Sequence, residues 1–159
     1  LADEGKIPLF EPATITQPGH YIVTRDINAL AGPIFDIQAD GVRLDLGGHT
    51  LSLASTTEDV IKITAGGSAK GIEIVNGKLN GGYNGIATMT EPLDKILLTL
   101  ADLEITAPTE AGIGIHALGM MEAKGIIVIN SKFGIDLRGD SGIPTSAALE
   151  DIHISGASE

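Results

Sequence analysis

Apolar and polar residues alternate in many short stretches of the chain, and these stretches recur at a nearly constant spacing. Alternation of this kind predicts a β-strand with one buried face. A Gly, Asn or Asp follows each of five such stretches, at intervals of 28, 26, 28 and 26 residues. Because these residue types tolerate a left-handed backbone at low cost, each is expected to form a one-residue corner between two strands. The apolar pairs and their corners are Leu44/Leu46 with Gly48, Ile72/Ile74 with Asn76, Leu98/Leu100 with Asp102, Ile126/Val128 with Asn130, and Ile152/Ile154 with Gly156.

A further set of apolar positions lies between these strand pairs. It comprises Phe35/Ile37, Ile61/Ile63, Ile86, Ile113/Ile115 and Ile135/Leu137. Three short strands in every 26–28 residues describe one coil of a β-solenoid, whose stacked coils bury a continuous aliphatic column. The similar stretches GIEIVNGKL (71–79) and GIIVINSKF (125–133) are expected to occupy equivalent places in different coils.

The repeat predicts a single all-β domain over residues 1–159, with about five to six coils. Residues 1–18, which contain three prolines, are expected to form an N-terminal cap and leading segment. The last coil is expected to be incomplete and to leave an open C-terminal end. An alternative is an antiparallel sandwich with a hairpin at NGGYNG (80–85), but it gives no reason for a recurring corner. The period and the lack of a helical stretch exclude a leucine-rich repeat.

The N-terminal part of the chain contains Pro18, Gly19, Tyr21, Thr24 and Asp26, followed by Asp45, Leu46, Gly48, Thr50 and Leu51. In these residues it resembles the opening coils of bacterial right-handed parallel β-helix proteins, the pectate-lyase-like superfamily. The resemblance implies a right-handed parallel β-helix and an extracellular or periplasmic location. The superfamily includes polysaccharide lyases, hydrolases and epimerases as well as non-catalytic members, so the resemblance leaves the chemistry open.

Composition excludes several classes of function. Ten Lys and Arg against 21 Asp and Glu give a formal net charge of −11, so the protein repels polyanions and no nucleic-acid partner is expected. No apolar run is long enough to span a membrane, so no membrane partner is expected. The chain has no Cys, which excludes disulfides and thiolate sites.

The resemblance implies that catalytic groups lie at outward positions of the first strand in each coil. There the candidates for catalysis are His116, Arg138, Asp136 and Lys62, and Gln38 and Asp36 are candidates for substrate binding. A third candidate for substrate binding is Tyr83 in the NGGYNG loop. His116 and Arg138 hold matching places in successive coils, so they are expected about 5 Å apart. The His could take a proton and the Arg could neutralise a carboxylate. The competing interpretation is a solvated face with an incidental ion pair.

Two functions from different classes follow. The first is binding or processing of an extracellular polysaccharide, with a lyase or epimerase favoured over a hydrolase. The second is a structural or adhesive β-helix that self-associates into a homo-oligomer or belongs to a longer protein. Self-association would use the outward apolar residues Val75, Ile127 and Ile129, or the open C-terminal end. No cofactor or metal site is expected from the histidine spacing; Ca²⁺ at GDSG (139–142) or STTED (55–59) is possible but unsupported.

Overall fold

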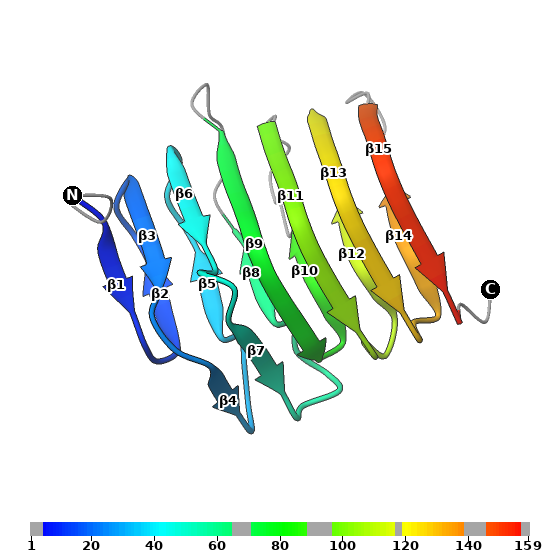
Figure 1. The fold of residues 1–159 in the computed structure, drawn as a ribbon, viewed down its shortest axis with the longest axis horizontal. Coiled ribbons are helices and arrows are strands. Elements are labelled where there is room, and N and C mark those ends of the chain that lie inside the picture. The colour runs from blue at the N-terminus through cyan, green and yellow to red at the C-terminus, as the bar shows by residue number, and fades with distance from the viewer. Residues whose placement is uncertain (1–4, 65–70, 89–96, 117–118, 139–145, 157–159) are drawn as a thin grey trace.

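The computed structural model describes residues 5–64, 71–88, 97–116, 119–138 and 146–156. These residues form fifteen strands and no helix, so the described chain offers no helical segment that could cross a bilayer. Every strand pair is parallel. The strands stack as a solenoid of about 5 turns, with the two ends of the chain at opposite ends of the stack (Figure 1). The predicted parallel β-helix is confirmed, and the antiparallel sandwich is wrong.

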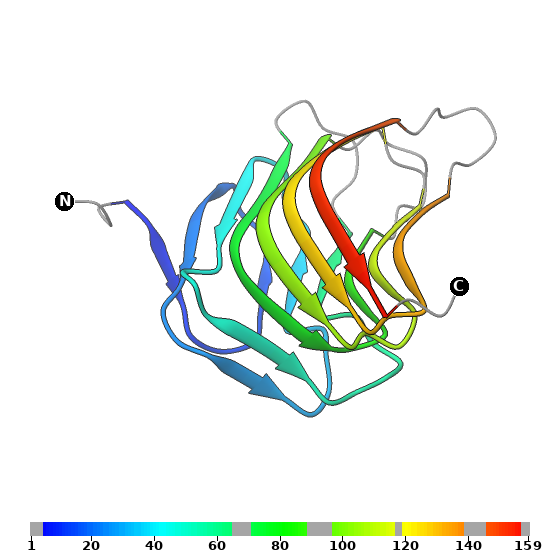
Figure 2. The same cartoon turned by 45° about the vertical axis from the view of Figure 1, so that its right-hand side comes forward.

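One wall of the solenoid is a nine-stranded sheet. Its later strands are ten residues long and bend around the molecule (Figure 2). The main path runs through β1 (Ile7–Leu9), β3 (Gly19–Val23), β6 (Val42–Asp45), β9 (Ile72–Gly81), β11 (Leu97–Thr106), β13 (Met120–Ile129) and β15 (Ser146–Ser155), with β4 (Ile27–Ala29) and β7 (Thr50–Leu53) off this path.

The opposite wall is a six-stranded sheet, visible behind the first in Figure 1. In stacking order it contains β2 (Ala13–Ile15), β5 (Phe35–Ile37), β8 (Ile61–Ile63), β10 (Asn84–Thr88), β12 (Ala111–His116) and β14 (Phe133–Arg138). The further set of apolar positions seen in the sequence falls on β5, β8, β10, β12 and β14 and was predicted correctly, whereas β2 was not predicted as a strand of this sheet.

The core consists of aliphatic rows in which each side chain lies on the equivalent one of the next coil. Leu51, Leu79, Ile105 and Val128 form one such row, because β7, β9, β11 and β13 pair in this register. All four are at most 1% exposed. Burial of each such side chain contributes about 1.5–3 kcal/mol, so the stacked rows are the main source of stability.

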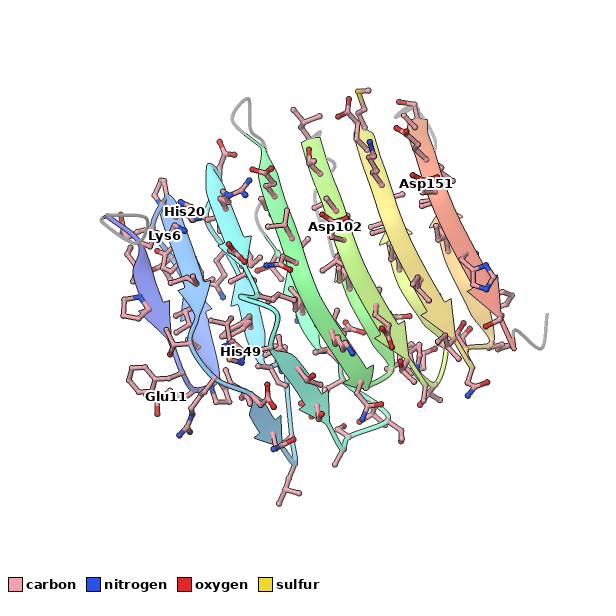
Figure 3. All side chains as sticks on the ribbon, viewed as in Figure 1. Lys6, Glu11, His20, His49, Asp102 and Asp151 are labelled. Atoms are coloured by element: carbon pink, nitrogen blue, oxygen red, sulfur yellow. The ribbon has the colours of Figure 1, made fainter. Side chains whose placement is uncertain are left out.

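The long strands bend at a first corner, where one residue per coil has a left-handed backbone. These residues are Asn76 (φ 63°), Asp102 (φ 53°), Gly125 (φ 66°) and Asp151 (φ 51°). Figure 3 labels Asp102 and Asp151 part-way along β11 and β15. Asn76 and Asp102 were predicted as corner residues and are confirmed, whereas Gly125 and Asp151 were not predicted.

A second corner follows the end of the long strands. Its left-handed residues are Gly81 (φ 81°), Ala107 (φ 55°), Asn130 (φ 56°) and Gly156 (φ 68°). Asn130 and Gly156 therefore turn the chain as predicted, but at a different corner from Asn76 and Asp102. The predicted ladder of five equivalent residues mixes two separate ladders.

The two similar nine-residue stretches consequently do not occupy equivalent places. Ile72 lies in register with Leu98 and Met121, whereas Ile126 lies in register with Leu103 and Gly77. GIIVINSKF is thus displaced by one strand segment relative to GIEIVNGKL, and the expectation that they stack is wrong. In both stretches an alternating strand is followed by a residue with a left-handed backbone. The same local sequence pattern therefore forms two different corners.

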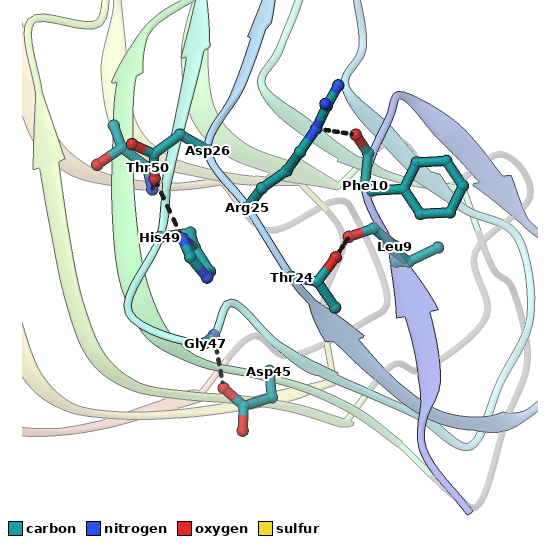
Figure 4. Close-up of polar contacts among 9 residues, drawn as sticks. All are labelled: Leu9, Phe10, Thr24, Arg25, Asp26, Asp45, Gly47, His49 and Thr50. Carbon is teal, nitrogen blue, oxygen red and sulfur yellow. Dashed lines mark hydrogen bonds and ion pairs between the residues drawn. The ribbon is translucent and has the colours of Figure 1, made fainter. Parts of the chain in front are cut away.

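The first coil is built from the segment expected to form the cap. β1 pairs with β3, and β2 pairs with β5. Side chains tie this coil to its neighbours, as Figure 4 shows: Thr24 Oγ1 donates to Leu9 O at 3.4 Å and Arg25 Nε donates to Phe10 O at 2.9 Å. Asp26 Oδ1 accepts the backbone N–H of Thr50 at 3.0 Å and lies 3.2 Å from His49 Nδ1.

Candidate functional site

The outward positions of the six-stranded sheet form a row that crosses five coils. Its members are in register from strand to strand and comprise Asp36, Lys62, Ala87, Gly114 and Asp136. From the strand spacing, Lys62 and Asp136 are about 14 Å apart along this row. Ala87 and Gly114 between them are both buried, although they point outward, because neighbouring groups close over these small residues.

His116 and Arg138 are paired residues on the neighbouring strands β12 and β14, as the sequence predicted. Both are exposed. Arg138 Nε donates to Asp136 Oδ2 at 2.9 Å, and Nη2 lies 2.6 Å from the same oxygen. The hydrogen bond from Arg138 to Asp136 is the main reason that the pKa of the guanidinium is raised. The structure therefore brings three of the four catalytic candidates together.

Tyr83 belongs to the same neighbourhood. Tyr83 and Glu110 both raise the pKa of Arg138 further through their negative charge when ionised. The Tyr83 side chain is 39% exposed, and its backbone N–H donates to Glu58 O at 2.7 Å. Tyr83 is therefore the exposed tyrosine among the described residues; it lies level with Glu110 immediately before β10, and its charge when ionised acts on Arg138.

The other two binding candidates lie three coil steps before His116. Gln38 Nε2 donates to Asp36 Oδ2 at 2.9 Å, and Thr64 Oγ1 donates to Asp36 Oδ1 at 2.8 Å. Both oxygens of Asp36 are thus engaged by neighbours on the same face. Asp36 and Gln38 are not brought together with Tyr83, so the predicted binding residues form two separate groups.

Lys62 lies between these groups and has an acidic neighbour, Asp59, outside the outward strand positions that the sequence indicated. Asp59 precedes β8 and is half-buried. Burial raises the pKa of its carboxyl, while hydrogen bonds from Asn84 and the charges of Lys62 and His116 lower it. The sequence indicates Asp59 only as part of a possible Ca²⁺ loop (55–59). Asp59 and Asn84 each stand two residues before an inward Ile. This shared position is the signal in the sequence that could have identified Asp59.

The residues expected to form an apolar contact surface are divided by the first corner. Val75 is 8% exposed and pairs with Asp45 and Ala101 before the corner. Ile127 lies after the corner, is 39% exposed and pairs with Glu104. Ile129 also lies after the corner, is half-buried and pairs with Thr106. The three side chains therefore do not form one exposed face.

The C-terminal coil presents a larger apolar surface. Side chains that continue the inner rows are exposed there: Leu137 by 37%, Leu149 by 49% and Ile154 by 41%. Within the described residues, β14 and β15 are the last strands of their sheets. Apolar surface combined with available strand edges is typical of a contact region.

The described residues contain no group of three or more His, Cys, Asp or Glu side chains placed to hold a metal ion. Of the two loops considered for Ca²⁺, 55–59 is described, and 139–142 lies outside the described residues. Comparison of the chain with models of protein families, with curated proteins and with solved structures found no match.

Proposed function

We propose that the protein binds a uronate-bearing polysaccharide on the outer face of the six-stranded sheet and cleaves it by β-elimination. The observation that supports this most is the side-by-side placement of His116 and Arg138, with Asp136 bonded to the guanidinium. A proton acceptor and a carboxylate-binding cation on adjacent strands are the two groups that proton abstraction next to a carboxylate requires.

In this reaction Arg138 binds the uronate carboxylate, and the incoming carboxylate competes with Asp136 for the guanidinium. Neutral His116 removes the proton from the carbon next to the carboxylate. Asp136 holds the Arg138 guanidinium in the absence of substrate. An epimerase would share this first step and differ in returning the proton to the opposite face of the sugar.

The charge of the protein favours a substrate with few carboxylates. A net charge of −11 repels a dense polyanion, and near Arg138 the acidic groups Asp136 and Glu110 add to that repulsion. Hydroxyl-rich parts of the same chain would be bound at the second group, where Asp36, Gln38 and Thr64 offer hydrogen-bonding groups. Membership of the pectate-lyase-like superfamily and an extracellular or periplasmic location are parts of the same proposal.

The test is a screen of neutral and uronate-bearing polysaccharides that measures the absorbance of unsaturated products and the release of reducing ends. His116→Ala and Arg138→Ala are expected to abolish activity. Arg43→Ala and His153→Ala are matched controls, because Arg43 pairs with Glu73 on the nine-stranded sheet and His153 is exposed on β15. Activity that survives both site substitutions refutes the site, and inactivity on every glycan refutes the proposed reaction.

A second candidate function is self-association through the C-terminal coil. It is favoured by the exposure of Leu137, Leu149 and Ile154, since a second copy would bury these side chains. Light scattering is expected to give the mass of an oligomer for the wild type and of a monomer for Leu149→Lys. Ile127→Asp, on the separate exposed site, is the control and should leave the mass unchanged. A monomeric wild type rules this candidate out.

A further inference from the structure

Thr88 is a polar residue of the core that lies beneath the site and that the mechanism above does not use. Its side chain is 0% exposed, and it stands in an inward row whose neighbouring members, Ile63 and Ile115, are aliphatic and equally buried. A buried hydroxyl lowers stability unless it is hydrogen-bonded, and Val has nearly the same shape without that cost. The hydroxyl at position 88 therefore needs a partner of its own.

That partner is the backbone of His116. Thr88 Oγ1 accepts the backbone N–H of His116 at 3.0 Å and donates to His116 O at 3.2 Å. Thr88 is the last residue of β10, and Ala87 before it pairs with Gly114. β12 therefore extends one residue beyond the level of Thr88, and that residue is His116. One hydroxyl thus takes the place that the backbone of the neighbouring strand holds in a regular parallel ladder.

These two hydrogen bonds fix the direction in which His116 projects. His116 is exposed and is the last residue of β12, a place where a strand opens locally unless its backbone is held. With both the N–H and the C=O bonded, the Cα–Cβ bond has a defined direction, and Arg138 stands at the paired place on β14. Proton abstraction depends on such placement, since a displacement of about 1 Å can lower a rate about 10²-fold.

We propose that Thr88 is a positioning residue, whose hydroxyl directs the His116 imidazole toward the proton that it removes from the uronate. Thr88 touches neither the substrate nor the reacting atoms and acts only through the His116 backbone. This inference rests on the proposed function and extends the outer site by one residue of the core. It also accounts for a hydroxyl between two isoleucines of the inward row.

Thr88→Val and Thr88→Ser test this role, because the first removes the hydroxyl at nearly constant shape and the second keeps it but removes a buried methyl. On the polysaccharide that the wild type cleaves, Thr88→Val is expected to lower kcat about 10–10²-fold with little change in KM, since Arg138 still binds the carboxylate. Thr88→Ser should keep most of the wild-type kcat although its denaturation midpoint falls below that of Thr88→Val. Ile63→Val, which loses a methyl from the same row, is the matched control and should lower the midpoint without changing kcat.

The order of His116 is measured without any substrate. In Thr88→Val, the His116 amide should exchange faster with solvent, and NMR relaxation should show greater motion of the imidazole. Thr88→Ser and Ile63→Val should keep the wild-type values. A wild-type kcat for Thr88→Val, unchanged order of His116, or kcat values that follow the stability of the variants overturn the role of Thr88 and leave the His116–Arg138 proposal intact. If the wild type cleaves no glycan, the proposed function fails, and the NMR measurements still decide whether Thr88 positions His116.

Discussion

Replacing Ala107 by Gly is expected to stabilise the protein, although the same change in a strand usually destabilises it. Ala107 is exposed and has φ 55°, and its neighbours in the second corner are Gly81 and Asn130. A side chain in this conformation costs about 1–2 kcal/mol. Glycine removes that cost but loses about 0.4–1 kcal/mol through the greater freedom of the unfolded chain. The expected net gain in unfolding free energy is about 0.5–1 kcal/mol. Each kcal/mol raises Tm by about 2–4 °C.

Denaturant unfolding followed by circular dichroism measures this difference as a shift of the midpoint at constant slope. Ala101→Gly in β11, the strand that precedes Ala107, is the control, since Ala101 lies outside the left-handed region, and it should lose about 0.5–1 kcal/mol. Opposite signs for the two variants are the expected result. If Ala107→Gly destabilises the protein as Ala101→Gly does, Ala107 is not a corner residue and the two-ladder register is wrong.

Other substitutions test the core and the acidic groups. Gly77→Ala is expected to cost about 1–3 kcal/mol in unfolding free energy, measured by denaturant titration, because its Cβ would collide with Leu46. Hydrogen bonds from Thr50 and His49 lower the pKa of Asp26 below 3.8, so its contribution to stability is present above that pH and is lost as the pH falls through the folded pKa. Asp26→Asn should therefore lower the denaturation midpoint near neutral pH but not in strong acid, and an equal effect at both pH values would contradict this. The raised pKa of Asp59 has the opposite sign, because the folded state holds that proton more tightly and stability falls as the pH rises through 3.8 and the folded pKa. Relative to the wild type, Asp59→Asn should therefore raise the denaturation midpoint more near neutral pH than in acid. A gain confined to acid would contradict the raised pKa of Asp59.

The local pattern was sufficient to identify the class of fold. Alternating apolar residues set the buried face of each strand, and Gly, Asn and Asp marked places where the backbone turns, because both preferences depend only on a residue and its near neighbours. The pairing of His116 with Arg138 also followed from the sequence, since both lie at the same offset from inward Ile and Leu residues.

The sequence could not decide which corner a turning residue occupies. Asn76 and Asn130 have nearly the same φ and similar flanking strands, yet one lies at the first corner and the other at the second. Ala107 turns the chain at φ 55° against its own preference, because the coils above and below it impose the corner. Such a residue is invisible to a search for Gly, Asn and Asp.

The residues of the candidate site also fall into those that the sequence indicated and those that only the tertiary structure revealed. The sequence by itself determined a stack of parallel coils and an outward face that carries His116, Asp136 and Arg138, because strand alternation and repeat length fix those directions. Only the tertiary structure brought Asp59 to that face, through Asn84 and the space at Gly114. Those three residues come from three different coils, and contacts between coils depend on stacking register, which no local pattern encodes.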